Sequence, residues 1–204
     1  LLGPTESEAL LLAIQGESPI SIRYNPLKNK QELSKASIPW ASNACYLPAR
    51  PSFTLDPLFH AGSYYVQEAS SMLIEQAITQ HLSKSQDRIV LDLCAAPGGK
   101  STHLASLLSK SDILVSNEVN KLRGSILSEN IQKWGSGNVL VSRNDSSDFK
   151  KLPEFFDCIL IDAPCSGEGM FRKDPKSIAE WSLSNVQTCV KRQQLIFDNI
   201  WASL

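Results

Sequence analysis

The stretch Leu91-Asp-Leu-Cys-Ala-Ala-Pro-Gly-Gly-Lys-Ser-Thr102 joins a predicted strand to a predicted helix. The strand is the short apolar run Ile89–Leu93, which contains β-branched residues, and the helix is Lys100–Ser109, whose leucines share one face. Between them, the Pro-Gly-Gly sequence at 97–99 allows a tight turn that lies close to a ligand, because glycine has no Cβ. Since the first amides of a helix are unpaired, this pattern predicts a nucleotide-like ligand site on an open α/β sheet.

A phosphate-binding P-loop is one interpretation of this turn. Gly99-Lys100-Ser101 matches the second half of the pattern G-x-x-x-x-G-K-[ST], and Ile159-Leu-Ile-Asp162 is similar to a strand ending in a magnesium-binding Asp. However, Cys94 replaces the first glycine, and Pro97 lacks an amide that would contact phosphate. A P-loop NTPase is therefore the weaker interpretation, and nucleotide binding with magnesium distinguishes it.

The composition is that of a folded chain with no overall signal for nucleic acid. The 204 residues suffice for one domain or one domain with a small addition, and 42% of them are hydrophobic. The net charge of −1 and the pI of about 6.4 mean that any RNA contact must depend on local basic patches. The five cysteines are an odd number without C-x-x-C spacing, which favours a reducing cytoplasm over a zinc or disulfide framework. Neither a membrane span nor a signal peptide is predicted.

The first part of the chain predicts a small α+β domain over residues 1–59. A helix is expected over Thr5–Gln15, with its first residue as the cap and Glu8 completing a capping box. The alternating stretch Ile20–Tyr24 predicts a strand. From Lys28 to Pro57, prolines and short apolar pieces recur, as in irregular connections.

The remainder, residues 60–204, predicts a doubly wound α/β domain. After a helix at Glu68–Leu82, strands and helices alternate, which indicates a parallel sheet. The expected elements after the central turn are strands at 113–117, 139–141 and 157–162, and helices at 121–134 and 183–204. Glu118, Asp145 and Asp162 follow successive strands, at the sheet edge where ligands bind.

Two motifs carry a resemblance to a known family. Every residue from Cys94 to Lys100 matches the cofactor signature of the S-adenosylmethionine-dependent RNA cytosine methyltransferases, and a second motif runs from Asp162-Ala-Pro-Cys to Pro175. The chain resembles the Nol1/Nop2/Sun family of RNA 5-methylcytosine methyltransferases from about Ser21 to its C-terminus. It is most like the bacterial ribosomal RNA subgroup, which carries Gly-Met-Phe-Arg-Lys after Pro-Cys. The resemblance implies an incomplete Rossmann-like methyltransferase sheet preceded by the small α+β domain, which would contact RNA.

The resemblance also implies the cofactor-binding residues. Glu118 stands 19 residues after Gly99, the spacing at which an acid reaches a ribose diol. Lys100 would face the methionine carboxylate, Asp145 the adenine amino group, and Asp162 the methionine part or the target base. Arg123 is open between a structural ion pair and a ligand contact. No metal is expected. The full cofactor-binding set is Cys94, Ala95, Ala96, Pro97, Gly98, Gly99, Lys100, Glu118, Asp145 and Asp162.

A cysteine is required because carbon 5 of cytosine is a poor nucleophile. A thiolate that adds to carbon 6 makes carbon 5 able to attack the sulfonium methyl group. In the resembled family the attacking cysteine lies in a Thr-Cys motif, and the Pro-Cys cysteine, here Cys165, assists product release. Thr188-Cys189 lies in a helical stretch and does not fit, so the Thr-Cys motif is expected beyond Leu204. The sequence therefore predicts a C-terminally truncated enzyme that is inactive alone.

Two alternatives remain open at this point. The chain could instead be a non-catalytic RNA-binding or assembly protein that keeps the methyltransferase fold, and a Thr-Cys beyond Leu204 would decide against this. A group of basic residues could bind phosphate, although a solvated helix face explains it nearly as well. These residues are Arg172, Lys173, Lys176, Lys191 and Arg192.

Overall fold

The computed structural model describes residues 2–29, 36–82, 87–174 and 176–204. Two compact units divide the chain. The larger unit joins Ile20–Ala163 to Ile196–Leu204, and the smaller joins Leu1–Pro19 to Pro164–Leu195. Residues 30–35, within the predicted irregular region, and Pro175, the end of the second motif, lie outside the described residues.

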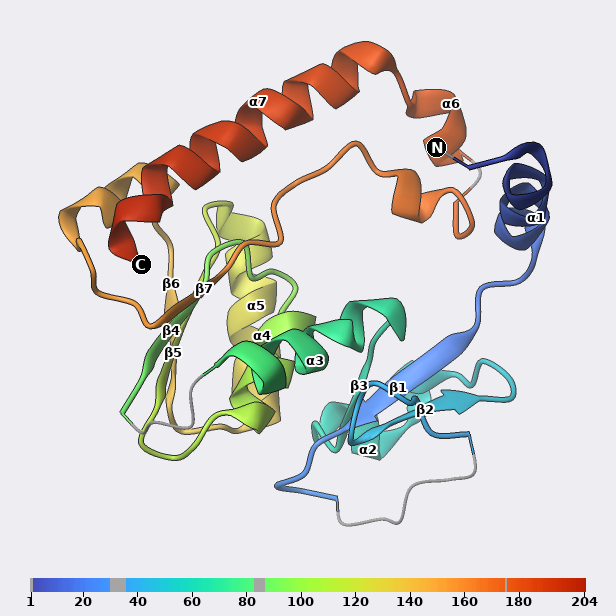
Figure 1. Ribbon diagram of the computed structural model, residues 1–204. Coiled ribbons are helices and arrows are strands. Elements are labelled where there is room, and N and C mark those ends of the chain that lie inside the picture. Colours follow the sequence, from blue (N-terminus) through green and yellow to red (C-terminus); the bar gives the residue numbers. More distant parts are fainter. Residues whose placement is uncertain (1, 30–35, 83–86, 175) are drawn as a thin grey trace. The chain divides into compact units, whose positions relative to one another are not determined.

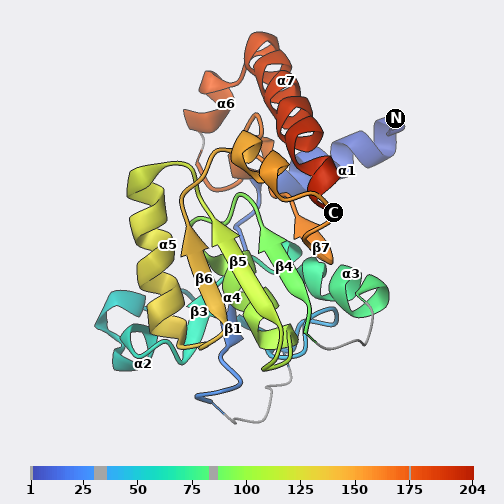
Figure 2. The same ribbon diagram turned by 90° about the vertical axis from the view of Figure 1, so that its left-hand side faces the viewer.

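A four-stranded parallel sheet forms the centre of the larger unit (Figures 1 and 2). Its strand order is β6-β5-β4-β7. The chain runs outward from β4 through β5 to β6, and then returns to β7 on the other side of β4. This reversal places the switch point of the sheet at β4, where doubly wound proteins bind ligands. The strands are β4 Ile89–Asp92, β5 Ile113–Asn117, β6 Val139–Ser142 and β7 Cys158–Leu160.

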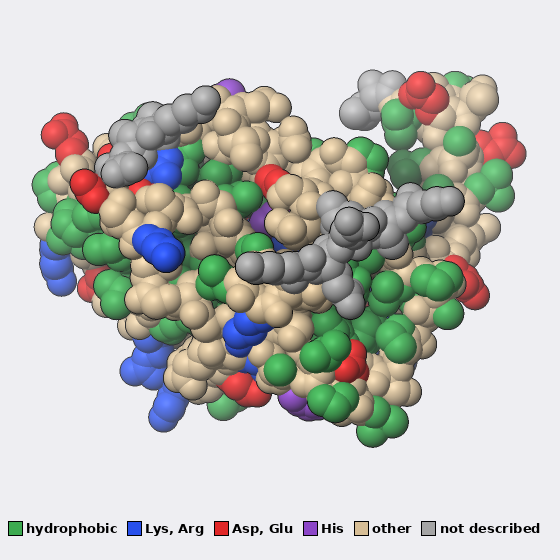
Figure 3. All heavy atoms as spheres, turned by 90° about the horizontal axis from the view of Figure 1, so that it is seen from below, with side chains coloured by type: hydrophobic (Ala, Val, Ile, Leu, Met, Phe, Trp, Pro, Cys, Tyr) green, Lys and Arg blue, Asp and Glu red, His purple; other side chains and the backbone are tan. Residues whose placement is uncertain are grey.

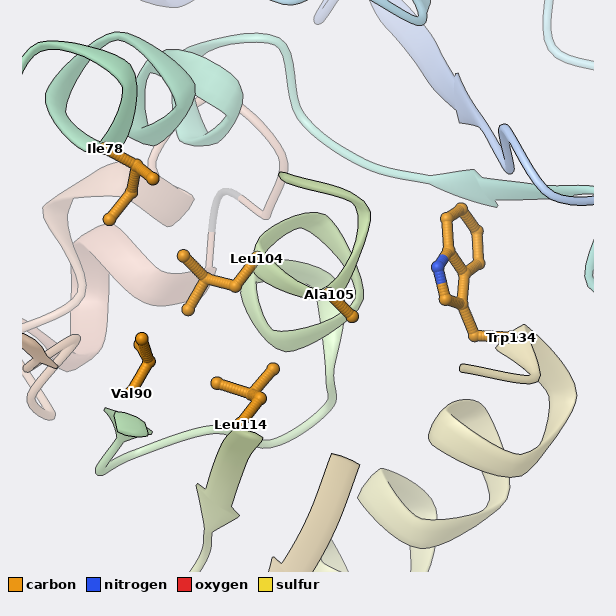
Figure 4. Close-up of a cluster of buried hydrophobic side chains, with 6 residues drawn as sticks. All are labelled: Ile78, Val90, Leu104, Ala105, Leu114 and Trp134. Atoms are coloured by element: carbon orange, nitrogen blue, oxygen red, sulfur yellow. The ribbon is translucent and has the colours of Figure 1, made fainter. Parts of the chain in front are cut away.

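Helices cover one face of this sheet. Alternate residues of a strand point to opposite sides of the sheet, so every second apolar residue faces these helices. Figure 2 shows α4 and α3 behind the strands and α5 beside β6. Val90 and Leu114 face these helices, in the cluster drawn in Figure 4 with Ile78, Leu104, Ala105 and Trp134. The helices are α3 Ile74–His81, α4 Gly99–Leu107 and α5 Lys121–Trp134.

The opposite face of the sheet has its own apolar cluster. Leu91 and Leu93 pack there with Phe149, Phe156 and Ile200. Phe149 comes from the 3-10 helix η3 (Ser146–Lys151), and Ile200 ends α7 (Leu183–Ile200) before η5 (Trp201–Ser203). The central strand β4 is therefore buried from both sides, as its apolar sequence predicts, whereas Leu140 of β6 is 60% exposed.

A second, antiparallel sheet lies in the same unit, with the order β2-β1-β3. Its strands are β1 Ile20–Tyr24, β2 Ala44–Leu47 and β3 Tyr64–Val66. The short helices η1 (Phe53–Leu55) and α2 (Pro57–His60) lie between β2 and β3. Since β3 pairs with β1, this sheet extends past residue 59. The division into domains 1–59 and 60–204 stays a prediction.

The smaller unit contains α1 Pro4–Gln15, η4 Glu168–Met170, α6 Lys176–Glu180 and the start of α7. The predicted capping box at Thr5 is wrong, since the N-cap is Gly3 and no side chain caps the helix. Pro4 explains the difference, because proline at the first helical position has a suitable φ and needs no amide partner.

The other boundaries differ only locally from those predicted. The single helix expected at Glu68–Leu82 is divided into η2 (Ser70–Leu73) and α3. The Ser71 hydroxyl donates to the Glu68 carbonyl at 2.8 Å, a local bond that competes with regular helix. Leu73, an apolar residue within this predicted helix, is 56% exposed. No helix among the described residues has the length and apolar character needed to cross a bilayer.

Candidate cofactor and active site

The turn between β4 and α4 is held by backbone hydrogen bonds at the switch point of the sheet. The Ala95 amide donates to the Asn117 carbonyl at 2.8 Å, and the Gly98 amide donates to the Ala95 carbonyl at 2.8 Å. Gly98 has a φ of +109°, and a Cβ there would lie 3.3 Å from Leu127 Cδ1. The left-handed φ therefore favours glycine at this position, and a Cβ there would require the Leu127 side chain to shift by a few tenths of an ångström.

Side chains from α5 and β3 hold the carbonyl groups of the turn. Arg123 Nη2 donates to the Ala96 carbonyl at 2.7 Å. Asn130 Nδ2 donates to the Pro97 carbonyl at 2.8 Å, and the Tyr65 hydroxyl donates to the same carbonyl at 3.3 Å. Protein side chains thus already bind these two carbonyls. The first amides of a helix have no carbonyl partner within the helix, so those of α4 are the groups available to an anionic ligand group.

A hollow of about 200 Å³ lies over the turn. Lys100 and Asp162 lie at this hollow as an ion pair, with Asp162 the more exposed partner. Both charges of a zwitterionic ligand therefore have an opposite charge available. The lining residues are Cys94, Ala95, Ala96, Pro97, Gly99, Lys100 and Asp162, with Tyr65, Val66, Gln67, Glu68 and Ser71.

Asp92, just before the cofactor turn, is a buried acid that the sequence analysis did not single out. It ends β4 and is fully buried, and its Oδ2 accepts a hydrogen bond from Ser101 Oγ at 2.6 Å. Its Oδ1 has no partner among the described residues. Burial raises the pKa of Asp92 to about 7, and the nearby charges of Asp162 and Glu118 act in the same direction. An acid at the end of an otherwise apolar strand was the available signal.

Glu118 and Asp145 follow β5 and β6 as predicted, but their environments differ. Glu118 is buried, and its Oε1 accepts from the Asn120 amide at 2.9 Å. Its Oε2 lies 3.6 Å from Arg123 Nη2, which makes Arg123 the structural partner that the sequence left open. Asp145 is exposed and accepts from the Ser147 amide at 2.9 Å, and hydrogen bonds from Ser147 lower its pKa.

The cysteines differ in burial. Cys94 is partly buried in the turn, and burial raises the pKa of its thiol to about 11, so it is neutral at physiological pH. Cys165 is exposed in the smaller unit, next to Pro164, whose carbonyl accepts from Gln193 Nε2 at 3.0 Å. The buried Cys189 lies inside α7, which confirms the helical setting of Thr188-Cys189. The release role of Cys165 stays a prediction.

Arg23 connects the small sheet to the cofactor turn, and the sequence analysis did not single it out. It is 1% exposed, and its Nε donates to Gln67 Oε1 at 2.8 Å. Its Nη2 donates to Thr102 Oγ1 at 2.6 Å and to the Gly99 carbonyl at 3.2 Å. The guanidinium also lies 4.5 Å from the centre of the Trp134 ring. The first turn of α4 is thus held from β1.

The parallel sheet with a glycine turn at its switch point places the larger unit in the Rossmann-like class of methyltransferase domains. The family described as "16S rRNA methyltransferase RsmB/F" matches residues 79–204, and the "N-terminal domain of 16S rRNA methyltransferase RsmF" matches residues 1–69. The chain belongs to the RsmB/F family of 16S rRNA methyltransferases, within the Nol1/Nop2/Sun family that the motifs predicted.

Individual relatives agree with this assignment. "Ribosomal RNA small subunit methyltransferase F" of Vibrio cholerae is 36% identical over 217 aligned positions, which cover 98% of this chain and 45% of the relative. The protein of the same name from Aeromonas salmonicida is 41% identical over 145 positions, covering 71% of this chain and 30% of the relative. The chain thus spans less than half the length of these relatives.

Solved structures show the same fold. The methyltransferase homolog protein from Pyrococcus horikoshii has a TM-score of 0.66 at 30% identity, with 90% of this chain and 62% of that chain covered. NSun6 from Pyrococcus horikoshii, solved with SFG, has a TM-score of 0.66 at 30% identity, with 76% and 38% covered. Both similarities support the methyltransferase fold rather than a P-loop NTPase.

Proposed function

We propose that the chain carries the cofactor site of an enzyme that transfers a methyl group from S-adenosylmethionine to carbon 5 of cytosine in small-subunit ribosomal RNA. The observation that carries the proposal is the Cys94–Lys100 turn under a hollow at the switch point of the sheet, in a member of the RsmB/F family. The proposed compartment is the cytoplasm, in keeping with five free cysteines.

The residues at the hollow fit this cofactor. Lys100 has the charge to bind the methionine carboxylate. Glu118 and Asp145 do not line the hollow, but they follow the neighbouring strands β5 and β6. Glu118 is proposed to accept from the ribose hydroxyls, and Asp145 from the adenine amino group. When bound, the cofactor would supply an electrophilic methyl group on its sulfonium. The residues of the turn would orient it.

The target cytosine requires a thiolate that adds to carbon 6 and later leaves as carbon 5 loses its proton. We propose Cys165 for the second half of this sequence, the release. In support, Cys165 lies in the Asp162-Ala-Pro-Cys motif that carries the family resemblance, and it is exposed.

Replacing Cys165 in the full natural protein tests this role. With tritiated S-adenosylmethionine and a small-subunit rRNA fragment, we expect Cys165→Ala to accumulate a covalent protein–RNA adduct that survives boiling in detergent. The first bond still forms in that variant, and only its breakdown slows. Cys189→Ala, at a buried cysteine of α7, is the matched control and should leave no adduct. Loss of activity without an adduct would instead make Cys165 the attacking thiol.

A further inference from the structure

A second cavity, of about 310 Å³, lies in the larger unit beside the small sheet and α5. We propose that this aromatic cavity binds one unpaired base of the RNA substrate, at a nucleotide near the target cytosine. The assignment rests on the proposed function. The lining residues are Arg50, Phe53, Thr54, Phe59, Gly62, Tyr64, Tyr65, Val66, Asn130, Lys133 and Trp134.

The cavity is built from aromatic rings. Phe53, Phe59 and Tyr64 form a tilted cluster with ring centroids 6.0–6.3 Å apart. Tyr65 and the buried Trp134 complete the lining. Every nucleobase has a π-face, so aromatic side chains hold unstacked bases with little dependence on sequence. A volume at the small end of ligand cavities suits one base and excludes a duplex.

Two cations lie against these rings. The Arg50 guanidinium lies 5.6 Å from the centre of the Phe53 ring, and Lys133 Nζ lies 4.8 Å from the centre of the Phe59 ring. No carboxylate is among the described residues that line the cavity. A base inserted between the rings would therefore bring its phosphates to two positive charges. Figure 3 shows that Lys and Arg side chains are scattered over the face seen from below Figure 1.

The aromatic cavity adjoins the cofactor turn through shared residues. Tyr65 and Val66 line both this cavity and the hollow over the turn. Asn130 lines the cavity and donates to the Pro97 carbonyl at 2.8 Å. A nucleotide held here would lie close to the base that reacts, so the cavity would help to fix the position of the target on the strand.

The first test is the affinity of the chain for a fluorescently labelled single-stranded oligonucleotide of small-subunit rRNA sequence, measured at several salt concentrations. Lys133→Gln and Arg50→Gln should each weaken binding and lower the salt slope by about 0.7, the value for one phosphate contact on a single strand. Lys110→Gln replaces an exposed lysine that does not line the cavity, and it should change the slope by much less.

The second test separates stacking from charge. Phe59→Leu keeps an apolar side chain but removes the ring, and we expect at least about 5-fold weaker binding, the lower end of the range for a lost base–aromatic stack. A double-mutant cycle combines this variant with oligonucleotides that each lack the base at one position. At one position, base removal should weaken binding to the original chain but not to Phe59→Leu.

The outcomes distinguish the two proposals. If the original chain binds RNA and the cavity variants match Lys110→Gln, with no abasic position coupled to Phe59, the cavity is not a base site. If the original chain binds S-adenosylmethionine but shows no affinity for RNA, the proposed RNA substrate is wrong, and the cavity assignment is overturned with it. Cofactor affinity, which these variants should leave unchanged, also reports that each variant is folded.

Discussion

At the scale of single residues, Asp92 at the end of β4 is buried at a cost to its charged form. Its carboxyl is fully buried with one satisfied oxygen, and burial raises its pKa to about 7. The charged form is therefore disfavoured in the folded protein unless a cation approaches. A bound ligand with a cationic group would supply that partner, so the buried acid would favour the loaded state over the empty one.

The raised pKa of Asp92 predicts a pH-dependent stability. A raised folded pKa contributes stability that is complete below the unfolded value of 3.8 and is lost as the pH rises through about 7. Asp92→Asn removes the charge and leaves an acceptor for Ser101. The measured quantity is the free energy of unfolding of Asp92→Asn minus that of the original chain. This difference should be roughly 2–3 kcal/mol larger at pH 8 than at pH 5.

Urea unfolding without cofactor at the two pH values measures this difference. Asp198→Asn, at an exposed residue of the larger unit, is the control and should show almost no pH-dependent gain. Equal behaviour of the two variants would mean that Asp92 is ionised in the folded protein at little cost.

Among the elements, α4 is held at its first turn by contacts that are distant in sequence. Arg23 of β1 donates to Thr102 Oγ1 and to the Gly99 carbonyl, and it also holds Gln67. Buried acceptors that lose their donor are destabilising, typically by about 1–3 kcal/mol each. The small sheet therefore has a structural role at the cofactor turn.

Arg23→Met should lower the free energy of unfolding by about 3 kcal/mol or more, because it leaves several buried acceptors unpaired. It should also weaken cofactor binding, since Gly99 belongs to the turn. Chemical unfolding and a cofactor titration measure the two effects. Arg143→Met, at an exposed position, should change neither. Retained stability in Arg23→Met would show that the network contributes little.

The elements also show what the sequence could predict. The helix at 121–134 and the strand at 113–117 were predicted with the observed bounds, because their signals are local: Asn120 caps the helix and Gly135 ends it. The cofactor turn was predicted because its glycines and proline are consecutive. Arg23 could not be predicted, because its partners Gln67, Gly99 and Thr102 are brought to it only by the fold. Asp92 was missed because burial, not sequence, gives it its raised pKa.

At the scale of the whole molecule, the predicted cofactor-binding residues lie within the larger unit. The chain spans 45% of the Vibrio cholerae relative, and its match to the RsmB/F family covers residues 79–204. The turn, the hollow and the acids after β5, β6 and β7 all lie within Ile20–Ala163. Cofactor binding is therefore the part of the proposed activity that can be measured with this chain alone.

Titration calorimetry of the chain with S-adenosylmethionine tests this central claim most directly. The original chain should bind one equivalent. Glu118→Ala should bind at least about tenfold more weakly, because charge-assisted hydrogen bonds to the ribose, worth roughly 1.5–3 kcal/mol each, are lost. Glu129→Ala, at an exposed glutamate of α5, should bind like the original chain. No binding by the original chain, or unchanged affinity in a folded Glu118→Ala variant, would contradict the account.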